Sequence, residues 1–542
     1  MKSYFTTIVM KRLVCLSICF ATCAFSRTNV GRRYLTQTSK GLISGVEDAQ
    51  NPRIISFKGI PYATPPVGQL RWRDPRPASN WSGIRSGENF GKACIQPLAY
   101  FDVLKVGDQS ENCLYLNVWT PHGAFTGLTE KKPVLFYIHG GSFTSGAGHI
   151  YPGAKLAEQD IVVVTFNYRL GNLGFLTHKG LSQEAPDAVG GNYGLMDQAL
   201  ALKWVRENIS KFGGDPNQVT IHGQSAGASS VAYMMVSPAT RGLFKRAIMQ
   251  SGYASTAKLD LAKHEKNGSD YATKLGCFNP PTAVACLRAK NSSVILDSMN
   301  DASFGPIVDG TYIPDTPNSL FERGQQAQVP ILLSETKDEA YIFTKPMQVY
   351  FVWQYKLKLE ELFKEFAGRV FDAFPAKSYS EVPDTMARVA TAAYYAAPIR
   401  RFLSVLSATH AMPTYQLYFT RLSEYAAGYE MGVFHGLDLF YLFNWIEGRD
   451  GFDQTDKLLE RALQSSYASF VKTGNPENDF LRQVAEQPQD GQRLWYPHDQ
   501  VNQHYLEFGD VIKQGANICS TSSGSCDLFD EIERAQGKSP LK

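Results

Sequence analysis

A serine flanked by two glycines is the feature of this chain with the clearest chemical meaning. The run Gly223-Gln224-Ser225-Ala226-Gly227 lies between an apolar, β-branched stretch, residues 219–222, and a helix-like stretch, residues 228–235. A strand, a sharp turn and a helix in this order would expose the Ser225 hydroxyl as a nucleophile at the end of a sheet. Such a turn leaves no space for side chains two residues before and after the serine, which explains the glycines. Because so short a pattern also arises by chance, the rest of a site has to be sought elsewhere in the sequence.

A second glycine-rich segment could supply hydrogen-bond donors to a reacting carbonyl group. The apolar run 133–138 leads into His139-Gly140-Gly141-Ser142-Phe143, where small residues allow backbone N–H groups to face the carbonyl. The N–H groups of Gly141, Ser142 and Ala226 would then form a three-donor oxyanion hole. Taken alone, the segment could also be a plain glycine turn after a strand.

A serine hydroxyl also needs a base within reach and a carboxylate that orients the base. Three carboxylates, those of Glu335, Asp338 and Glu339, follow the apolar run 329–333, and on residue type alone any of them could serve. Among the later histidines, His435 lies in an irregular, glycine-flanked segment, residues 432–438, that suits a catalytic loop. The other histidines downstream of the serine are His264, His410, His498 and His504.

The elements that would position these residues alternate between strand and helix from residue 130 to residue 252. Apolar runs predict strands at 133–138, 161–168 and 219–221, and a helical face that ends before Gly213-Gly214 is formed by Leu195, Ala199, Leu202, Val205 and Ile209. This alternation predicts a mostly parallel sheet covered by helices on both faces, with the site at the carboxyl ends of the strands. Residues 345–430 are predicted to be helical, without strands, and to form a lid or pocket wall. No repeat or long linker divides residues 27–542, which are therefore expected to form one domain.

The first 26 residues have the pattern of a secretory signal peptide. Lys11 and Arg12 precede an apolar run, residues 13–25, that ends in a small-x-small cleavage pattern. A membrane anchor is the alternative, but a run of about 13 residues is shorter than the roughly 17 to 25 needed to span a bilayer. Removal of this segment lowers the formal net charge from +3 to zero. The balance gives no reason to expect a nucleic-acid or anionic-membrane partner.

The number of cysteines and the presence of glycosylation sequons are both typical of an exported protein. Outside the leader the chain keeps an even number of cysteines, whose spacing suggests the pairs Cys94–Cys113, Cys277–Cys286 and Cys519–Cys526, with buried thiols as the alternative. Four Asn-x-Ser sequons, at Asn80, Asn208, Asn267 and Asn291, are candidate glycosylation sites, although Asn208 lies within a helical pattern.

From about residue 40 to residue 510 the chain resembles the type-B carboxylesterases, the cholinesterase and carboxylesterase branch of the α/β-hydrolases. The resemblance rests on an ordered series of motifs that includes Phe57-Lys58-Gly59-Ile60-Pro61-Tyr62-Ala63, Pro65-Pro66-Val67-Gly68, Ser110-Glu111-Asn112-Cys113-Leu114-Tyr115-Leu116-Asn117, Asn167-Tyr168-Arg169-Leu170-Gly171, Gly174-Phe175, Phe212-Gly213-Gly214-Asp215-Pro216 and Thr473-Gly474-Asn475-Pro476.

The resemblance implies a role for each candidate residue. It assigns the triad to Ser225, Glu339 and His435, in the chain order of the α/β-hydrolases, and leaves Glu335 and Asp338 with structural or solvated roles. Asp438 is expected to support the histidine loop and Ser251 to hydrogen bond behind the triad. The disulfides Cys94–Cys113 and Cys277–Cys286 and an ion pair between Arg71 and Glu111 are implied as well. The chemistry requires no metal or organic cofactor.

Two departures from the family pattern concern the substrate. Gln224 occupies a position that is usually glutamate, and residues 95–112 contain no tryptophan for a cation–π contact, so choline esters are not expected to be preferred. Ser142 stands where glycine is usual. The chain is therefore expected to be a secreted serine carboxylesterase for neutral, largely apolar esters, acting through an acyl-enzyme on Ser225. A lipase, a juvenile hormone esterase with the same Gly-Gln-Ser-Ala-Gly elbow, and an inactive, neuroligin-like adhesion protein are the alternatives.

Overall fold

The computed structural model describes residues 32–97, 105–254, 261–298, 304–487, 492–519 and 526–535. The predicted signal peptide, residues 1–26, lies outside the described residues.

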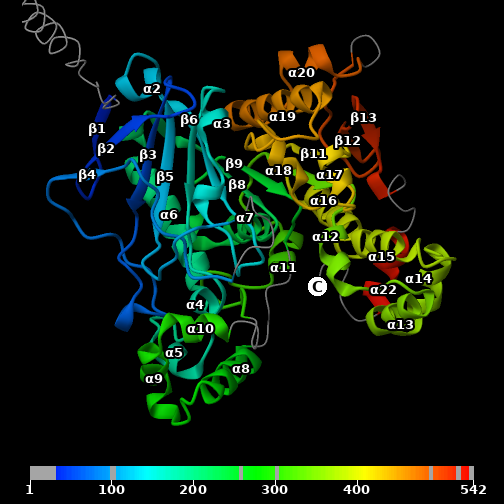
Figure 1. Ribbon diagram of the computed structural model, residues 1–542, viewed down its shortest axis with the longest axis horizontal. Coiled ribbons are helices and arrows are strands. Elements are labelled where there is room, and N and C mark those ends of the chain that lie inside the picture. Colours follow the sequence, from blue (N-terminus) through cyan, green and yellow to red (C-terminus); the bar gives the residue numbers. More distant parts are fainter. Residues whose placement is uncertain are drawn as a thin grey trace, which may run out of the picture.

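A single large sheet runs through the molecule (Figure 1). It has 13 strands in the order β1-β2-β3-β5-β7-β6-β8-β9-β10-β11-β12-β13, with β4 paired to β2. The central strands from β7 to β12 pair in parallel, and the strands at both edges pair antiparallel, except that β4 pairs with β2 in parallel. The strands are β1 (Arg33–Gln37), β2 (Leu42–Glu47), β3 (Ile54–Pro61), β4 (Ile84–Ser86), β5 (Tyr115–Pro121), β6 (Lys132–Ile138), β7 (Val162–Phe166), β8 (Gly214–Gln224), β9 (Arg246–Gln250), β10 (Ile331–Thr336), β11 (Thr414–Phe419), β12 (His504–Phe508) and β13 (Ile512–Ala516).

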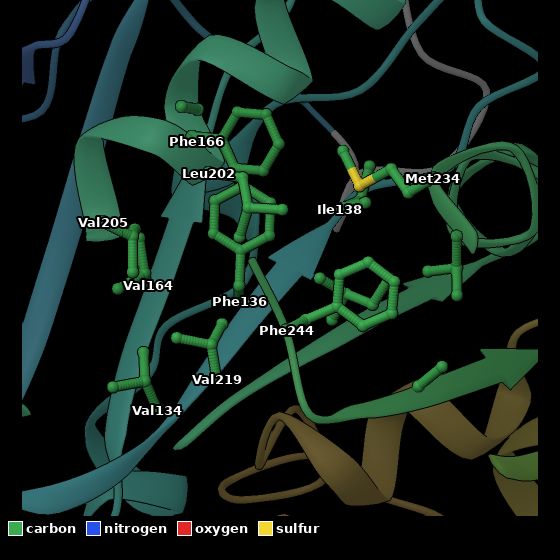
Figure 2. Close-up of a cluster of buried hydrophobic side chains, with 14 of the residues drawn as sticks. Val134, Phe136, Ile138, Val164, Phe166, Leu202, Val205, Val219, Met234 and Phe244 are labelled. Atoms are coloured by element: carbon green, nitrogen blue, oxygen red, sulfur yellow. The ribbon is translucent and has the colours of Figure 1, made fainter. Parts of the chain in front are cut away.

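The central strands are apolar on both faces because helices cover both sides of the sheet. On β6, Val134, Phe136 and Ile138 face one hydrophobic cluster, whereas Leu135 and Tyr137 face another. Figure 2 shows the first cluster, in which side chains of β6, β7 and β8 pack against Leu202, Val205 and Met234 of the helices. The continuous apolar runs that predicted these strands thus reflect burial on both faces.

Two groups of helices cover the two faces of the sheet. Helices α6, α7, α11 and α16 contribute to the cluster of Figure 2, and α3, α18, α19 and α20 contribute to the cluster on the opposite face. The α-helices are α2 (His122–Thr126), α3 (Ala154–Ala157), α4 (Gly171–Phe175), α5 (Lys179–Glu184), α6 (Tyr193–Asn208), α7 (Ala226–Val236), α8 (Leu261–Lys274), α9 (Ala283–Ala289), α10 (Ser292–Asp297), α11 (Pro317–Glu322), α12 (Tyr341–Thr344), α13 (Val352–Phe363), α14 (Ala367–Ala373), α15 (Val382–Thr391), α16 (Ala397–Thr409), α17 (Glu424–Gly428), α18 (Leu437–Leu442), α19 (Gln454–Thr473), α20 (Asp479–Val484) and α22 (Cys526–Ala535).

The prediction of a mostly parallel sheet with helices on both faces, as in the α/β-hydrolases, is confirmed. The three predicted central strands correspond to β6, β7 and β8, and the predicted helical face belongs to α6. The prediction that residues 345–430 contain no strand is wrong, because β11 lies in this range and pairs in parallel with β10 and β12. The rest of the range is largely helical, and α13, α14 and α15 share a hydrophobic cluster with the C-terminal α22 (Figure 1).

Three disulfides join the expected pairs, Cys94–Cys113, Cys277–Cys286 and Cys519–Cys526. The implied ion pair is also present: Arg71 donates two hydrogen bonds to the carboxylate of Glu111, at 2.7 and 2.5 Å. Arg71 donates further hydrogen bonds to backbone oxygens of residues 287, 288 and 290. It thereby ties the first disulfide loop to the segment that follows the second disulfide.

The four sequons differ in accessibility. Asn80, Asn267 and Asn291 are exposed. Asn208 is buried, its Oδ1 accepts a hydrogen bond from the N–H of Ser39, and its Nδ2 donates to the carbonyl oxygen of Trp204. The prediction of a glycan on Asn208 therefore does not fit the folded protein, because both ends of its amide are occupied inside the structure. Within the described residues, no helix combines the length and apolar character of a membrane span.

Candidate active site

Ser225 lies at the turn between β8 and α7, as the sequence predicts. Its backbone has φ 58° and ψ −125°, a conformation that a residue with a side chain rarely adopts. The turn is held by a hydrogen bond from the Ser225 N–H to the carbonyl oxygen of Gln250 on β9, at 2.8 Å. Such strain persists only where the surrounding structure enforces it, and it places the serine at the carboxyl end of the parallel strands.

The two glycines of the elbow are required by close backbone contacts. A Cβ atom on Gly227 would lie 2.1 Å from the carbonyl oxygen of Ile138 on β6, and one on Gly223 would lie 2.2 Å from the backbone of Gly227. Both distances are far below van der Waals contact. The first turn of α7 can therefore pack directly against β6 only because residue 227 is glycine.

Glu339 and His435 come together from two loops at the same end of the sheet. The Nδ1 atom of His435 lies 2.5 Å from Oε2 of Glu339, which is fully buried. The other oxygen of Glu339 accepts a hydrogen bond from the N–H of Thr336, at 2.7 Å. Both oxygens of the Glu339 carboxylate are thus engaged. Because a carboxylate only accepts hydrogen bonds, Nδ1 of His435 carries the proton, and Nε2 is left as the proton acceptor.

Asp338 joins the two loops. Its backbone N–H donates to the carbonyl oxygen of Val433, and its carboxylate accepts from the Val433 N–H at 2.8 Å. Its carboxylate also lies against Gly432, where φ is 59° and a Cβ atom would be 2.6 Å from Oδ2. Asp338, which lies between β10 and Glu339, therefore holds the segment that carries His435 close to Glu339.

Two of the three expected donors of an oxyanion hole, Gly141 and Ser142, line the same cavity as Ser225. Gly141 (φ 103°) and Ser142 (φ 54°) lie in a tight turn in which the Gly141 carbonyl oxygen accepts from the N–H groups of Thr144 and Ser145. Among the described residues, no hydrogen bond occupies the N–H of Gly141 or of Ser142. The N–H of Ala226 belongs to the first turn of α7, where it has no acceptor within the helix.

His139 lies immediately before this turn and packs in the core. The sequence did not indicate this burial. Its ring is fully buried and stacks on Tyr168 with 4.3 Å between ring centroids. Burial lowers the pKa of His139 to about 4, so the ring is neutral near pH 7. Tyr168 also donates a hydrogen bond from its hydroxyl to the carbonyl oxygen of His139.

Two further carboxyl groups lie buried behind Glu339. Burial and the nearby Glu339 raise the pKa of Glu335 to about 8 and that of Asp438 to about 7. Glu335 accepts a hydrogen bond from Gln416, and Asp438 accepts one from Gln250. Glu335 therefore keeps its proton near pH 7 and Asp438 is only partly ionised there, which limits the negative charge that accumulates beside Glu339.

Asp438 belongs to a chain of buried polar groups that the sequence did not suggest. Gln250 donates from Nε2 to Asp438 and contacts His222 through Oε1, at 2.8 and 2.5 Å. The hydroxyl of Ser251, expected to hydrogen bond behind the triad, is buried and has no partner among the described residues. The N–H of Ser251 instead donates to the carbonyl oxygen of Ser334, so this residue joins β9 to β10 through its backbone.

The remaining surroundings of His435 are an amide and two aromatic rings. Nε2 of Gln224 lies 3.0 Å from Nε2 of His435. Phe343 and Tyr395 pack beside the imidazole, with ring centroids 5.2 and 5.4 Å from it. These aromatic neighbours come from segments that the sequence could not place near the histidine.

Ser225 and His435 open onto one cavity of about 310 Å³. No described residue that lines it carries a carboxylate, an ammonium or a guanidinium group. Besides the serine, the histidine and the glycine-rich turn, the wall is largely aromatic and aliphatic, and it includes Ile150, Tyr151, Ile342, Phe343, Tyr425, Tyr429, Phe434, Leu439, Phe440 and Trp445. The arrangement can hold an uncharged carbonyl compound next to a serine, an imidazole and free backbone donors.

Comparisons with known proteins agree with this chemistry. The model of the Carboxylesterase family matches residues 33–522. A fumonisin B1 esterase of Sphingopyxis macrogoltabida is 32% identical over 91% of this chain and 90% of its own length. A para-nitrobenzyl esterase of Bacillus subtilis (strain 168) is 34% identical over 78% of this chain and 87% of its own length. A protein of Dictyostelium discoideum named Crystal protein is 31% identical over 88% of this chain and 87% of its own length. The chain therefore belongs to the carboxylesterase family, has the α/β-hydrolase fold and is a carboxylic ester hydrolase.

Proposed function

We propose that this protein is a secreted serine esterase that hydrolyses neutral, largely apolar carboxylic esters through an acyl-enzyme on Ser225. The observation that carries the proposal is the cavity itself, in which a strained serine and a carboxylate-bound histidine face an apolar, aromatic wall without ionised carboxylates or basic side chains. Sites of this kind bind ligands mainly by apolar contact and orient them with a few polar groups.

In the proposed mechanism, Nε2 of His435 takes the proton of the Ser225 hydroxyl as its oxygen attacks the ester carbonyl carbon. Glu339 stabilises the resulting imidazolium through Nδ1–H. The N–H groups of Gly141, Ser142 and Ala226 bind the oxyanion of the tetrahedral intermediate. His435 then returns the proton to the leaving alcohol, and water, activated by the same imidazole, hydrolyses the acyl-enzyme.

Replacement of Ser225 by alanine tests the nucleophile. We expect the S225A variant to lose hydrolysis of p-nitrophenyl butyrate by a factor of at least about 10³. A fluorophosphonate probe should label the wild-type protein at Ser225 and leave the variant unlabelled. Turnover by S225A at the wild-type rate would exclude Ser225 as the nucleophile. A wild-type protein that is neither labelled nor active would favour the adhesion-type alternative.

Paired substrates test the preference for neutral esters. Acetylthiocholine and an uncharged thioester of the same length should be hydrolysed with kcat/KM values within about fivefold of each other, because no carboxylate of the cavity attracts a cation. A p-nitrophenyl ester series of increasing acyl length would show how much of the aromatic wall contributes. Activity that rises sharply only above the critical micelle concentration of the substrate would favour a lipase.

Export is the third part of the proposal, and it rests on the sequence of residues 1–26 and on the three disulfides. Expression of the full chain in a eukaryotic secretory host should release the protein into the medium. Its N-terminus, read by mass spectrometry, should begin close to residue 27. Retention of an uncleaved chain in the membrane fraction would support an anchor instead.

A further inference from the structure

The amide of Gln224 is the only side chain, within the described residues, that hydrogen bonds to the proton-accepting nitrogen of His435. Because Nδ1–H donates to Glu339, Nε2 of the neutral ring carries a lone pair. The amide nitrogen of Gln224, 3.0 Å away, is the end of the carboxamide that can donate to this lone pair. This contact therefore selects the neutral form of the imidazole.

Two glycines leave the space that this amide occupies. A Cβ atom on Gly140 would lie 2.9 Å from Oε1 of Gln224, and one on Gly436 would lie 3.4 Å from Nε2. The carboxamide thus lies between the oxyanion turn and the histidine loop, and its side chain is almost completely buried, with 5% of the residue exposed.

The other ionisable groups around His435 come from three elements. Glu339 follows β10 and faces Nδ1, with Glu335 of β10 behind it. Asp438 lies in the first turn of α18, and Tyr395 of the π-helical turn Ala392–Ala396 packs beside the ring. Glu339 contacts Nδ1, and both Glu335 and Asp438 interact electrostatically with Glu339, whereas Nε2 contacts the uncharged amide of Gln224.

We propose that Gln224 is a positioning residue that favours the neutral form of His435, whose Nε2 lone pair must leave the Gln224 amide to accept the proton of Ser225, and that it thereby extends ester hydrolysis to lower pH than a glutamate at this position would allow. A carboxylate in the same place would lie about 3 Å from Nε2 and would accept a hydrogen bond only from the protonated ring. It would favour the imidazolium, which cannot take the proton of Ser225. The carboxamide exerts no such charge effect. The inference rests on the proposed function, since it needs His435 as the base.

The pH dependence of kcat/KM tests this role in the full-length protein. Wild type, Gln224→Glu and the uncharged Gln224→Met are compared with p-nitrophenyl butyrate from pH 4.5 to 9, each profile being normalised to its own plateau at high pH. We expect the acidic limb of Gln224→Glu to move upward by about one pH unit or more, and that of Gln224→Met to move by less than about 0.5. The downfield proton NMR signal of the His435 Nδ1–H should report the same order of titration midpoints. Should Gln224→Glu fail to fold, Gln224→Asp supplies a carboxylate in the same cavity.

Superimposable acidic limbs for wild type and the carboxylate variant would overturn the inference. So would an equally large shift in Gln224→Met, because the effect would then come from packing and not from charge. Labelling of Ser225 by a fluorophosphonate separates these failures from failure of the proposed function. A protein that is labelled but has unshifted limbs contradicts only the role of Gln224, whereas a protein that is not labelled contradicts the esterase mechanism itself.

Discussion

Oε2 of Glu339 lies 2.5 Å from Nδ1 of His435, across 96 residues of sequence. The contact is possible because β10 and the segment after residue 432 reach the same end of the sheet, where Asp338 forms an isolated parallel bridge with Phe434. The acid and the base are therefore positioned by a small β-like pairing and not only by their own hydrogen bond.

Replacement of Glu339 by glutamine should reduce kcat by roughly 10³- to 10⁴-fold, because an amide can donate to Nδ1 and so favour the wrong tautomer of the imidazole. Hydrolysis of p-nitrophenyl butyrate measures the loss. Asp338→Asn is the matched control: it makes the same chemical change one residue away, keeps an acceptor for the Val433 N–H, and should cost less than about tenfold. An E339Q variant that keeps more than a tenth of the activity would contradict the role of Glu339.

Gly227 should not tolerate even a methyl group. Gly227→Ala would place a Cβ atom 2.1 Å from the carbonyl oxygen of Ile138, so α7 must shift away from β6 and carry Ser225 with it. We expect activity to fall by at least about 100-fold, since a displacement of this order at the nucleophile is costly. Gly428→Ala, at a position with no neighbour within 4 Å of the added carbon, should leave kcat within about twofold. Similar activity in the two variants would show that the elbow can relax.

Sequence alone predicted those parts of the fold whose signals are local. The runs that became β6 and β7 are apolar throughout because both faces are buried, and the elbow around Ser225 could be read from five residues. The strand β11 was missed because Tyr415, Tyr418 and Phe419 lie in a mainly helical, aromatic segment. What makes this segment a strand is its pairing with β10 and β12, each more than 70 residues away in the sequence.

Contacts between loops could not be predicted either. Gln224 could be recognised as unusual, but its amide contact with His435, 211 residues away, depends on two glycines in two separate loops. In the same way, the burial of Glu335 and Asp438 near Glu339 depends on β10 and α18 contributing to one hydrophobic cluster, although about 100 residues separate them in the sequence. Their side chains look like ordinary surface carboxylates in the sequence.

The buried ion pair of Arg71 should contribute far more to stability than an exposed pair of the same geometry. The side chains of Arg71 and Glu111 are 6% and 14% exposed, whereas those of Arg369 and Glu531 are 51% and 52% exposed. Removal of Arg71 leaves a partly buried carboxylate and three backbone oxygens without their donor. We expect Arg71→Met to lower the free energy of unfolding by about 3 kcal/mol, and Arg369→Met to lower it by much less, because solvent screens the exposed pair. Thermal and denaturant unfolding of both variants would measure the difference, and equal losses would contradict it.

Glu335 should make the protein less stable as the pH rises through the neutral range. Its pKa is raised from 4.5 to about 8, so below pH 4.5 the carboxyl group is protonated in both the folded and the unfolded state and has no effect. Between these two values the unfolded chain releases the proton while the folded protein retains it, so folding becomes less favourable with increasing pH. The penalty is complete above about pH 8.

Glu335→Gln keeps an oxygen that can accept from Gln416 but has no proton to lose, so its stability relative to wild type should increase from pH 4.5 to pH 8. An increase on the order of 2 to 5 kcal/mol is expected, since one pKa unit corresponds to about 1.4 kcal/mol. Guanidinium unfolding at several pH values would measure it, with the same substitution at the exposed Glu130 as the control. A difference between E335Q and wild type that is constant, or that decreases with pH, would show that Glu335 is ionised in the folded protein.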